Sequence, residues 1–299
     1  MGALIEINTD GLAKFAETIS FALGGTARGE KKMADAKAYA AELEAKTKNK
    51  VALIEAQGKD DLANYVAAKE TRKMKNTMAV IEKAQTHFTE GEKVSDEPID
   101  EGWKNRFFGI VEEISDEELR EIWGCVLAGE VKKPKSYSLR TLEVLRNLTK
   151  DEASLIAKIV PNVLKEEYVY RNDVLTVSES LILQDCGIML GDGHGIQIQF
   201  EVEPNNKYAF VLDKEYALTL YNNSSELKKC GVRIYKLTTA GKEIVRLIYV
   251  NQNARDLFIK SFVNYLYSKG FSKISKRRII NINDENVDCS DEEEVYNKE

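Results

Sequence analysis

Residues 114–148 decide the predicted fold and read ISDEELREIWGCVLAGEVKKPKSYSLRTLEVLRNL. Ser115 precedes three carboxylates, so its hydroxyl can cap free amides while the acidic side chains lie at the positive end of a helix dipole. Apolar residues then recur as on the buried face of a packed helix. They are Leu119, Ile122, Trp123, Val126 and Leu127. Gly129 and Pro134 end this pattern, and Ser136 or Ser138 can cap a second helix, so we predict two packed helices joined by a basic link.

The same stretch carries a resemblance to a known family. The pattern Trp103, Phe107 and Phe108, followed by ISDEE, a Trp, LAGE, a Pro and SYSLRTLEVLRNL, resembles a bacterial family described only as domain of unknown function 2806. The resemblance extends from the N-terminal helix to about Phe271 and is most specific at residues 115–148. Members are similar, more loosely, to abortive-infection proteins, which implies a bacterial or prophage origin and a role in phage defence. That family has no assigned catalytic residues, so the resemblance supplies none here.

Composition indicates a globular protein of the cytoplasm. The 299 residues are 43% hydrophobic, which is enough to bury a core. The net charge is -6, but residues 284–299 hold eight acidic residues and one lysine, so removing their -7 leaves +1 for residues 1–283. A nearly neutral body argues against a protein that coats nucleic acid. The four cysteines form no CxxC pair, and neither a signal peptide nor ~18 consecutive apolar residues occur, so we expect reduced thiols and a cytoplasmic location.

Residues 1–93 predict an amphipathic segment followed by a long helix or helical hairpin. The apolar side of the amphipathic segment carries Leu12, Phe15, Ile19 and Leu23. Its polar side has few basic residues, whereas membrane-surface helices are rich in Lys and Arg, so docking on this chain or on another copy is favoured over membrane contact. Residues 28–93 are dominated by Ala, Glu and Lys, which favour helix. Their narrow apolar stripe needs a partner, either a second copy in a coiled coil or the same chain folded back at Gly58.

The remaining chain predicts a linker at residues 94–102, a central helical domain at residues 103–174 and an α+β domain at residues 175–283. The last begins with a short helix from Ser178 to Cys186. Strand-like runs follow at 188–190, 196–202, 208–212, 217–221 and 232–237. A helix opening at LTTAGKEI completes an order that resembles winged-helix modules. The helix before the strands has no basic residue, whereas a groove-reading helix needs one, so a scaffold for packing or protein contacts is favoured over DNA binding.

Two basic groups are candidates for anion or nucleic-acid contact. The first comprises Lys132, Lys133, Lys135 and Ser136, which precede a helix N-terminus and can bind a phosphate, although a surface link is favoured. The second comprises Lys273, Lys276, Arg277 and Arg278, and the acidic residues follow closely. We expect the acidic tail and this second group to neutralise one another, or the tail to be a solubilising end. Residues 284–299 are assigned as a disordered acidic tail.

No catalytic, cofactor or metal site is predicted. His87 and His194 lie far apart in the sequence, and neither has Cys, His or carboxylate neighbours at metal-ligand spacing. Cys125 is assigned to an apolar helix face as a small core residue. The GDGHG run with Asp192 and His194 is assigned to a hairpin turn rather than to catalysis. The chain has no GxxxxGK[ST], GxGxxG or GxSxG motif.

The sequence therefore predicts a mainly α protein with a C-terminal α+β part: a long N-terminal helix or helical hairpin, a central helical domain and a winged-helix-like C-terminal region. The favoured function is a non-enzymatic cytoplasmic bacterial protein that self-associates and acts in stress response or phage defence. The alternatives are a DNA-binding winged-helix regulator and a membrane-acting effector that uses residues 12–23. The expected partner is a second copy, and no small-molecule substrate or cofactor is identified.

Overall fold

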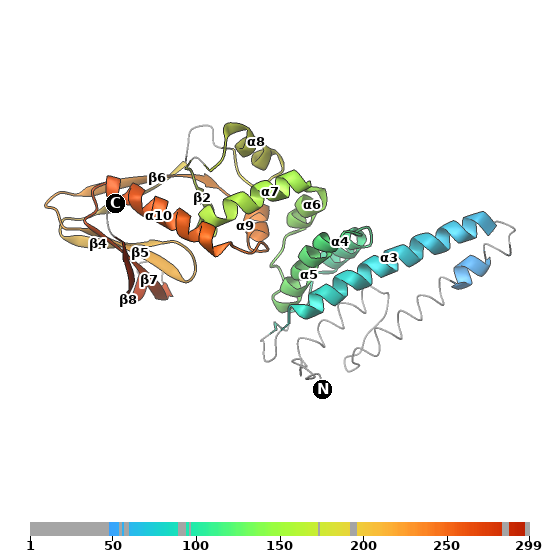
Figure 1. Ribbon diagram of the computed structural model, residues 1–299. Coiled ribbons are helices and arrows are strands. Elements are labelled where there is room, and N and C mark those ends of the chain that lie inside the picture. The colour runs from blue at the N-terminus through green and yellow to red at the C-terminus, as the bar shows by residue number, and fades with distance from the viewer. Residues whose placement is uncertain are drawn as a thin grey trace. The chain divides into compact units, whose positions relative to one another are not determined.

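The chain folds as two compact units that divide between Arg146 and Asn147 (Figure 1). The computed structural model describes residues 48–53, 56, 60–88, 94–95, 97–172, 174–191, 196–282 and 287–296. A helical part comes first, and the C-terminal part adds two four-stranded antiparallel sheets, so the fold is α+β overall. The division falls inside residues 103–174, which the sequence assigns to one domain. The predicted segment 12–23, Gly58 and residues 192–195 of the GDGHG turn lie outside the described residues.

Helices form the described core of the first unit. They are α3 (Asp60–Thr86), α4 (Glu101–Val111), α5 (Glu117–Lys132) and α6 (Leu139–Asn147). The long helix α3 lies along α5, as Figure 1 shows. In the core, Phe107 stacks on Trp103 with ring centroids 4.9 Å apart and meets the edge of Trp123 at 5.6 Å. The predicted apolar face of α5 is confirmed at Trp123, Val126 and Leu127, which are fully buried.

The cap of α5 differs by one residue from the prediction. Asp116, not Ser115, is the N-cap, and its Oδ1 accepts hydrogen bonds from the backbone amides of Glu118 and Leu119 at 3.0 and 3.1 Å. A carboxylate at this position satisfies two free amides and also faces the positive end of the helix dipole. Aspartate is therefore the stronger cap of the two.

The link between α5 and α6 is built around the buried carboxylate of Glu130. Its two oxygens accept hydrogen bonds from the backbone amides of Lys135 at 2.6 Å and Tyr137 at 3.0 Å. The indole of Trp103 donates to the carbonyl of Tyr137 at 2.8 Å. A Cβ at Gly129 would lie 2.7 Å from the Tyr137 ring, so only glycine leaves room for that ring. The LAGE and SYS parts of the quoted stretch thus form one packed unit.

The second unit contains the helices α7 (Lys150–Ile159), α8 (Val177–Asp185), α9 (Thr239–Val245) and α10 (Gln252–Ser268). Thr149 caps α7 and forms a capping box with Glu152. A second capping box, Thr176 with Glu179, starts α8 slightly earlier than the predicted Ser178. Pro161 stands in the 3-10 turn η1 (Val160–Asn162) that follows α7, since proline cannot continue an α-helix. Side-chain caps therefore set most helix starts.

Both sheets of the second unit are antiparallel. The first has the order β1-β2-β6-β3, and the second has the order β4-β5-β7-β8. The strands of the first are β1 (Val163–Leu164), β2 (Tyr168–Tyr170), β6 (Lys228–Lys236) and β3 (Ile196–Val202). The strands of the second are β4 (Asn206–Val211), β5 (Tyr216–Asn222), β7 (Lys273–Ile282) and β8 (Val287–Tyr296). Residues of α10, among them Phe258 and Phe262, join apolar residues of both sheets in one core.

The strand predictions are confirmed at 196–202 and nearly so for β4, β5 and β6. Residues 188–190 form only an isolated bridge from Met189 to Leu237. The assignment of residues 284–299 to a disordered tail is corrected for residues 287–296, which form β8. Acidic residues of β8 lie opposite basic residues of β7, for example Glu294 opposite Lys276 and Glu292 opposite Arg277. Opposite charges across a strand pair stabilise it, which explains an ordered strand with so few apolar residues.

Candidate functional site

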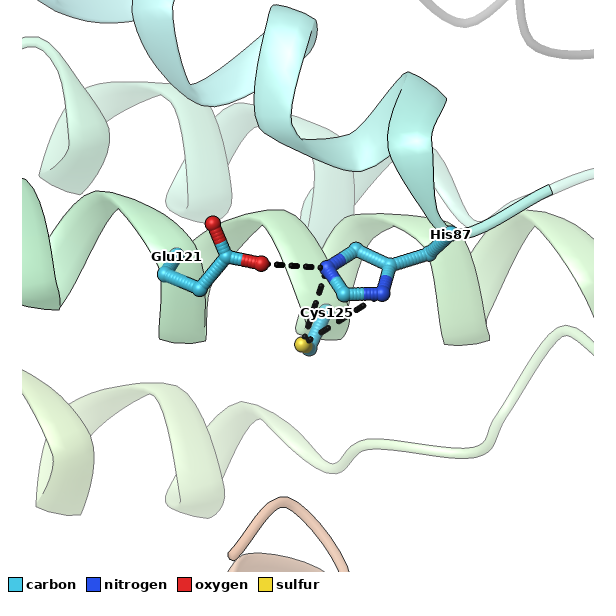
Figure 2. A group of neighbouring side chains, drawn as sticks. All are labelled: His87, Glu121 and Cys125. Carbon is cyan, nitrogen blue, oxygen red and sulfur yellow. Dashed lines mark hydrogen bonds and ion pairs between the residues drawn. The ribbon is translucent and has the colours of Figure 1, made fainter. Parts of the chain in front are cut away.

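One histidine, one glutamate and one cysteine meet in the first unit: His87, Glu121 and Cys125 (Figure 2). His87 directly follows the end of α3, whereas Glu121 and Cys125 lie on α5. Residues at positions i and i+4 of a helix share one face, so the glutamate and the cysteine point to the same side. The cluster therefore exists only because α3 packs against α5.

Gly124 allows the two helices to approach closely beside this cluster. A Cβ at Gly124 would lie 2.7 Å from Cβ of Lys83 and 3.0 Å from the backbone nitrogen of Ala84. No larger residue fits there without moving α3. His87 comes three positions after Ala84, so the close approach brings its ring within reach of α5.

Both neighbours of His87 contact the same ring nitrogen. Nε2 of His87 lies 2.9 Å from Oε1 of Glu121 and 3.2 Å from Sγ of Cys125, whereas Nδ1 is 3.9 Å from the sulfur (Figure 2). A nucleophilic relay places the acid and the nucleophile on opposite ring nitrogens. This geometry is therefore unsuited to such a relay. Instead, the three donor atoms converge and all lie within 4.8 Å of one another.

The cluster is half-exposed and lies among charges of both signs. The side chains of His87 and Glu121 are 31% and 45% exposed, so water and small ions reach them. Burial, and then the charge of Glu121, raise the pKa of the Cys125 thiol, while Lys132 acts in the opposite direction. Nζ of Lys132 donates to the His87 carbonyl at 2.6 Å, and Nζ of Lys83 lies 3.5 Å from Oε2 of Glu121.

The cluster corrects two sequence interpretations. His87 does have a carboxylate and a thiol as neighbours, and Cys125 is half-buried beside the histidine rather than a core residue. The available signal was the i, i+4 pair of Glu121 and Cys125 on a predicted helix. His87 is 34 positions from Glu121 in the sequence, and only the packing of α3 on α5 brings the three together.

The first predicted basic group does not converge on one anion position. Lys132 bonds to the His87 carbonyl, Lys135 pairs with Glu97, and the hydroxyl of Ser136 donates to the carbonyl of Lys133 at 2.6 Å. These contacts stay within the chain and stabilise the link. The interpretation as a surface link is the one that the geometry favours.

The second predicted basic group lies on β7, and the acidic strand β8 neutralises it. Lys273 and Arg277 both pair with Glu292, at 2.7 and 2.9 Å, and Arg278 reaches Glu293 at 3.5 Å. Nζ of Lys276 lies 4.2 Å from the ring centroid of Tyr216. Hydrogen bonds from Lys273 and then Tyr221 lower the pKa of Glu292 to about 2. Three of the four basic residues thus pair with acidic residues of β8.

Large apolar side chains are exposed on several elements of the part of the chain that the structure describes, among them α8 and α3. On α8, Val177, Leu181 and Ile182 are 75%, 53% and 42% exposed. In the first half of α3, Leu62 and Tyr65 are exposed. The candidate self-association or membrane residues Leu12, Phe15, Ile19 and Leu23 lie outside the described residues. No described helix combines the length and apolar character that a membrane crossing requires.

Residues 62–176 match a family model described as protein of unknown function (DUF2806). The chain thus contains a DUF2806 domain, as the resemblance indicated. The matched segment includes residues 115–148 but is shorter than the resemblance suggested, since it does not reach Phe271. It contains all three residues of the His–Glu–Cys cluster. Neither the curated proteins nor the solved structures include a match to this chain.

Proposed function

We propose that this DUF2806-containing protein works through self-association, as a non-enzymatic cytoplasmic bacterial protein in stress response or phage defence. The observation that carries the proposal is the exposed apolar face of α8, formed by Val177, Leu181 and Ile182. Adjacent apolar side chains in contact with water mark surfaces of protein association. In a two-fold dimer the same patch meets itself, so two copies of α8 would cover each other's apolar faces.

The framework around α8 supports this role. The capping box of Thr176 and Glu179 fixes its first turn, and Lys158 of α7 pairs with Glu179 at 2.6 Å. On its inner side, Ser180 and Leu183 are buried. A surface that is already ordered before binding loses little conformational entropy on association. The apolar face is therefore presented in a fixed orientation.

The winged-helix-like interpretation of residues 175–283 belongs to the same proposal. A helix, strands and a helix follow one another here as that interpretation expects, but the four strands between α8 and α9 belong to two sheets rather than to one β-ribbon. In it, α8 occupies the position of the reading helix, yet its sequence VSESLILQD has neither Lys nor Arg. Base and phosphate contacts depend largely on such side chains. Lys273, Arg277 and Arg278 of β7 are paired with acidic residues of β8, so protein contact is favoured over the alternative of a DNA-binding regulator.

The first test is the mass of the full-length chain by light scattering at micromolar concentrations. We expect an oligomer that the variant Leu181→Asp converts toward monomer, because a carboxylate cannot be buried unpaired in the interface. The matched variant Leu62→Asp changes an exposed leucine of α3 and should leave the mass unchanged. A monomeric wild type, or dissociation by Leu62→Asp alone, would overturn the assignment to α8. Deleting residues 1–90 is unsuitable as a test, because Val80, Ile81 and Ala84 of α3 belong to the core.

Three further measurements separate the alternatives. Titration with duplex DNA at low salt should show no binding, and salt-sensitive binding would favour the DNA-binding regulator. Flotation with anionic vesicles tests the membrane-acting effector and should leave the protein in solution. Phage plating efficiency on cells that express the wild type or Leu181→Asp tests the physiological role. Equal protection by both proteins would show that phage defence does not depend on self-association through α8.

A further inference from the structure

We propose that His87, Glu121 and Cys125 bind a divalent transition metal ion of the Zn²⁺ class. This assignment is independent of self-association through α8. Imidazole nitrogen, thiolate sulfur and carboxylate oxygen are the ligands that Zn²⁺ takes in proteins. Mg²⁺ and Ca²⁺ prefer oxygen ligands alone, so the mixed donor set favours a transition metal.

The spacing of the donor atoms fits one ion. Zn²⁺ binds sulfur at about 2.3 Å and nitrogen or oxygen at about 2.0–2.2 Å, which places two tetrahedral ligands about 3.3–3.6 Å apart. The observed separations from Nε2 are 2.9 Å to Oε1 of Glu121 and 3.2 Å to Sγ of Cys125. These two pairs need to open by only about 0.4 Å, which small side-chain rotations supply, and the third pair, Oε1 of Glu121 and Sγ of Cys125, lies within 4.8 Å.

The shared ring nitrogen points to the same conclusion. Glu121 and Cys125 both approach Nε2 of His87, and one N–H donates a well-aligned hydrogen bond to only one of them. A cation between the three atoms contacts all of them at once (Figure 2). On binding, the Cys125 thiol releases its proton to solvent, and the imidazole binds through Nε2 in the tautomer whose single proton is on Nδ1. The thiolate and the carboxylate then balance the two positive charges of the ion.

The helical framework holds the ligands in place before an ion binds. Glu121 and Cys125 share a face of α5 next to the fully buried Trp123 and Val126, and Gly124 fixes the distance of α3. Nζ of Lys132 holds the backbone carbonyl of His87, and Nζ of Lys83 lies near Oε2 of Glu121, leaving Oε1 toward the histidine. Such supporting contacts tune metal affinity. The three protein ligands and their exposure leave a fourth position for an exchangeable solvent molecule.

The test uses the full-length protein, freed of metal by a chelator and titrated with Co²⁺ and then Zn²⁺. We expect one Co²⁺ per chain, with a thiolate-to-metal charge-transfer band in the near ultraviolet that Zn²⁺ abolishes by displacement. Cys125→Ser should remove this band, and His87→Gln and Glu121→Gln should each weaken Zn²⁺ binding by at least about tenfold. Zn²⁺ should also raise the melting temperature of the wild type.

Matched controls make the outcome decisive. Cys186→Ser removes another half-buried cysteine, and Glu118→Gln removes another carboxylate of α5, so both should bind Co²⁺ like the wild type. Circular dichroism shows whether each variant is folded, and Glu121→Gln changes a side chain exposed enough to spare the fold. Absence of Co²⁺ binding, or a charge-transfer band that survives in Cys125→Ser, would overturn the metal site.

Discussion

Gly124 illustrates how one residue sets the distance between two helices. In a free helix alanine is favoured over glycine by about 1 kcal/mol, so a glycine in the middle of α5 requires a reason. Its Cα faces α3, where an added Cβ would lie 2.7 Å from Lys83 and 3.0 Å from the backbone of Ala84. Gly124 therefore lowers the intrinsic helix propensity of α5 but allows α3 to approach closely.

Replacing Gly124 by alanine should lower the free energy of unfolding by about 1–3 kcal/mol, because the methyl group forces α3 away from α5. Gly109, in α4, offers a matched control, since nothing lies within 4 Å of an added Cβ. Gly109→Ala should instead stabilise the protein by up to about 1 kcal/mol. Urea unfolding of both variants measures the two changes, and effects of the same sign would contradict the close-approach argument.

The strand β8 shows, at the scale of one element, how charge can order a segment that lacks an apolar pattern. Its burial alternates only weakly, yet it pairs with β7 along its whole length. Lys273, Arg277 and the hydroxyl of Tyr221 all reach Glu292. These contacts depend on the ionised carboxylate, so the pairing of the two strands is expected to depend on pH.

Acid should release β8 from β7. The pKa of Glu292 is lowered from an ordinary value of 4.5 to about 2 in the folded chain. Its contribution to stability is therefore complete above about pH 4.5 and is lost as the pH falls toward 2. Hydrogen exchange of residues 287–296, corrected for intrinsic rates, should show falling protection over this range. Glu292→Gln should reduce protection already at neutral pH, whereas the exposed control Glu203→Gln should not, and unchanged protection down to pH 2 would refute the argument.

Local sequence signals predicted the helices and strands better than they predicted the contacts between them. Apolar periodicity predicted the buried face of α5 at Trp123, Val126 and Leu127, and alternation predicted β3. The sequence did not predict the strands β7 and β8. They are held together by basic residues of one strand and acidic residues of the other, and neither segment alone shows this pairing. The His–Glu–Cys cluster was missed for a related reason: half of its signal is local to α5, but His87 joins it only through packing with α3.

At the scale of the whole molecule, each unit contains its own aromatic core. Phe107 lies between Trp103 and Trp123 in the first unit. Phe262 is surrounded by Tyr170, Phe210 and other residues of the second unit, and its cluster includes no residue before Leu164. Both phenylalanines are fully buried. Separate cores imply that each unit gains its stability largely from its own residues.

Calorimetry of the full chain should therefore show two unfolding transitions, one for each unit. Removing a buried phenylalanine side chain costs about 3–5 kcal/mol, so Phe107→Ala should lower one transition and Phe262→Ala the other. Because the two substitutions delete the same group from equally buried positions, each variant serves as the control for the other. If the units depended on one another, either substitution would lower both transitions together, and a single cooperative transition in the wild type would show the same dependence.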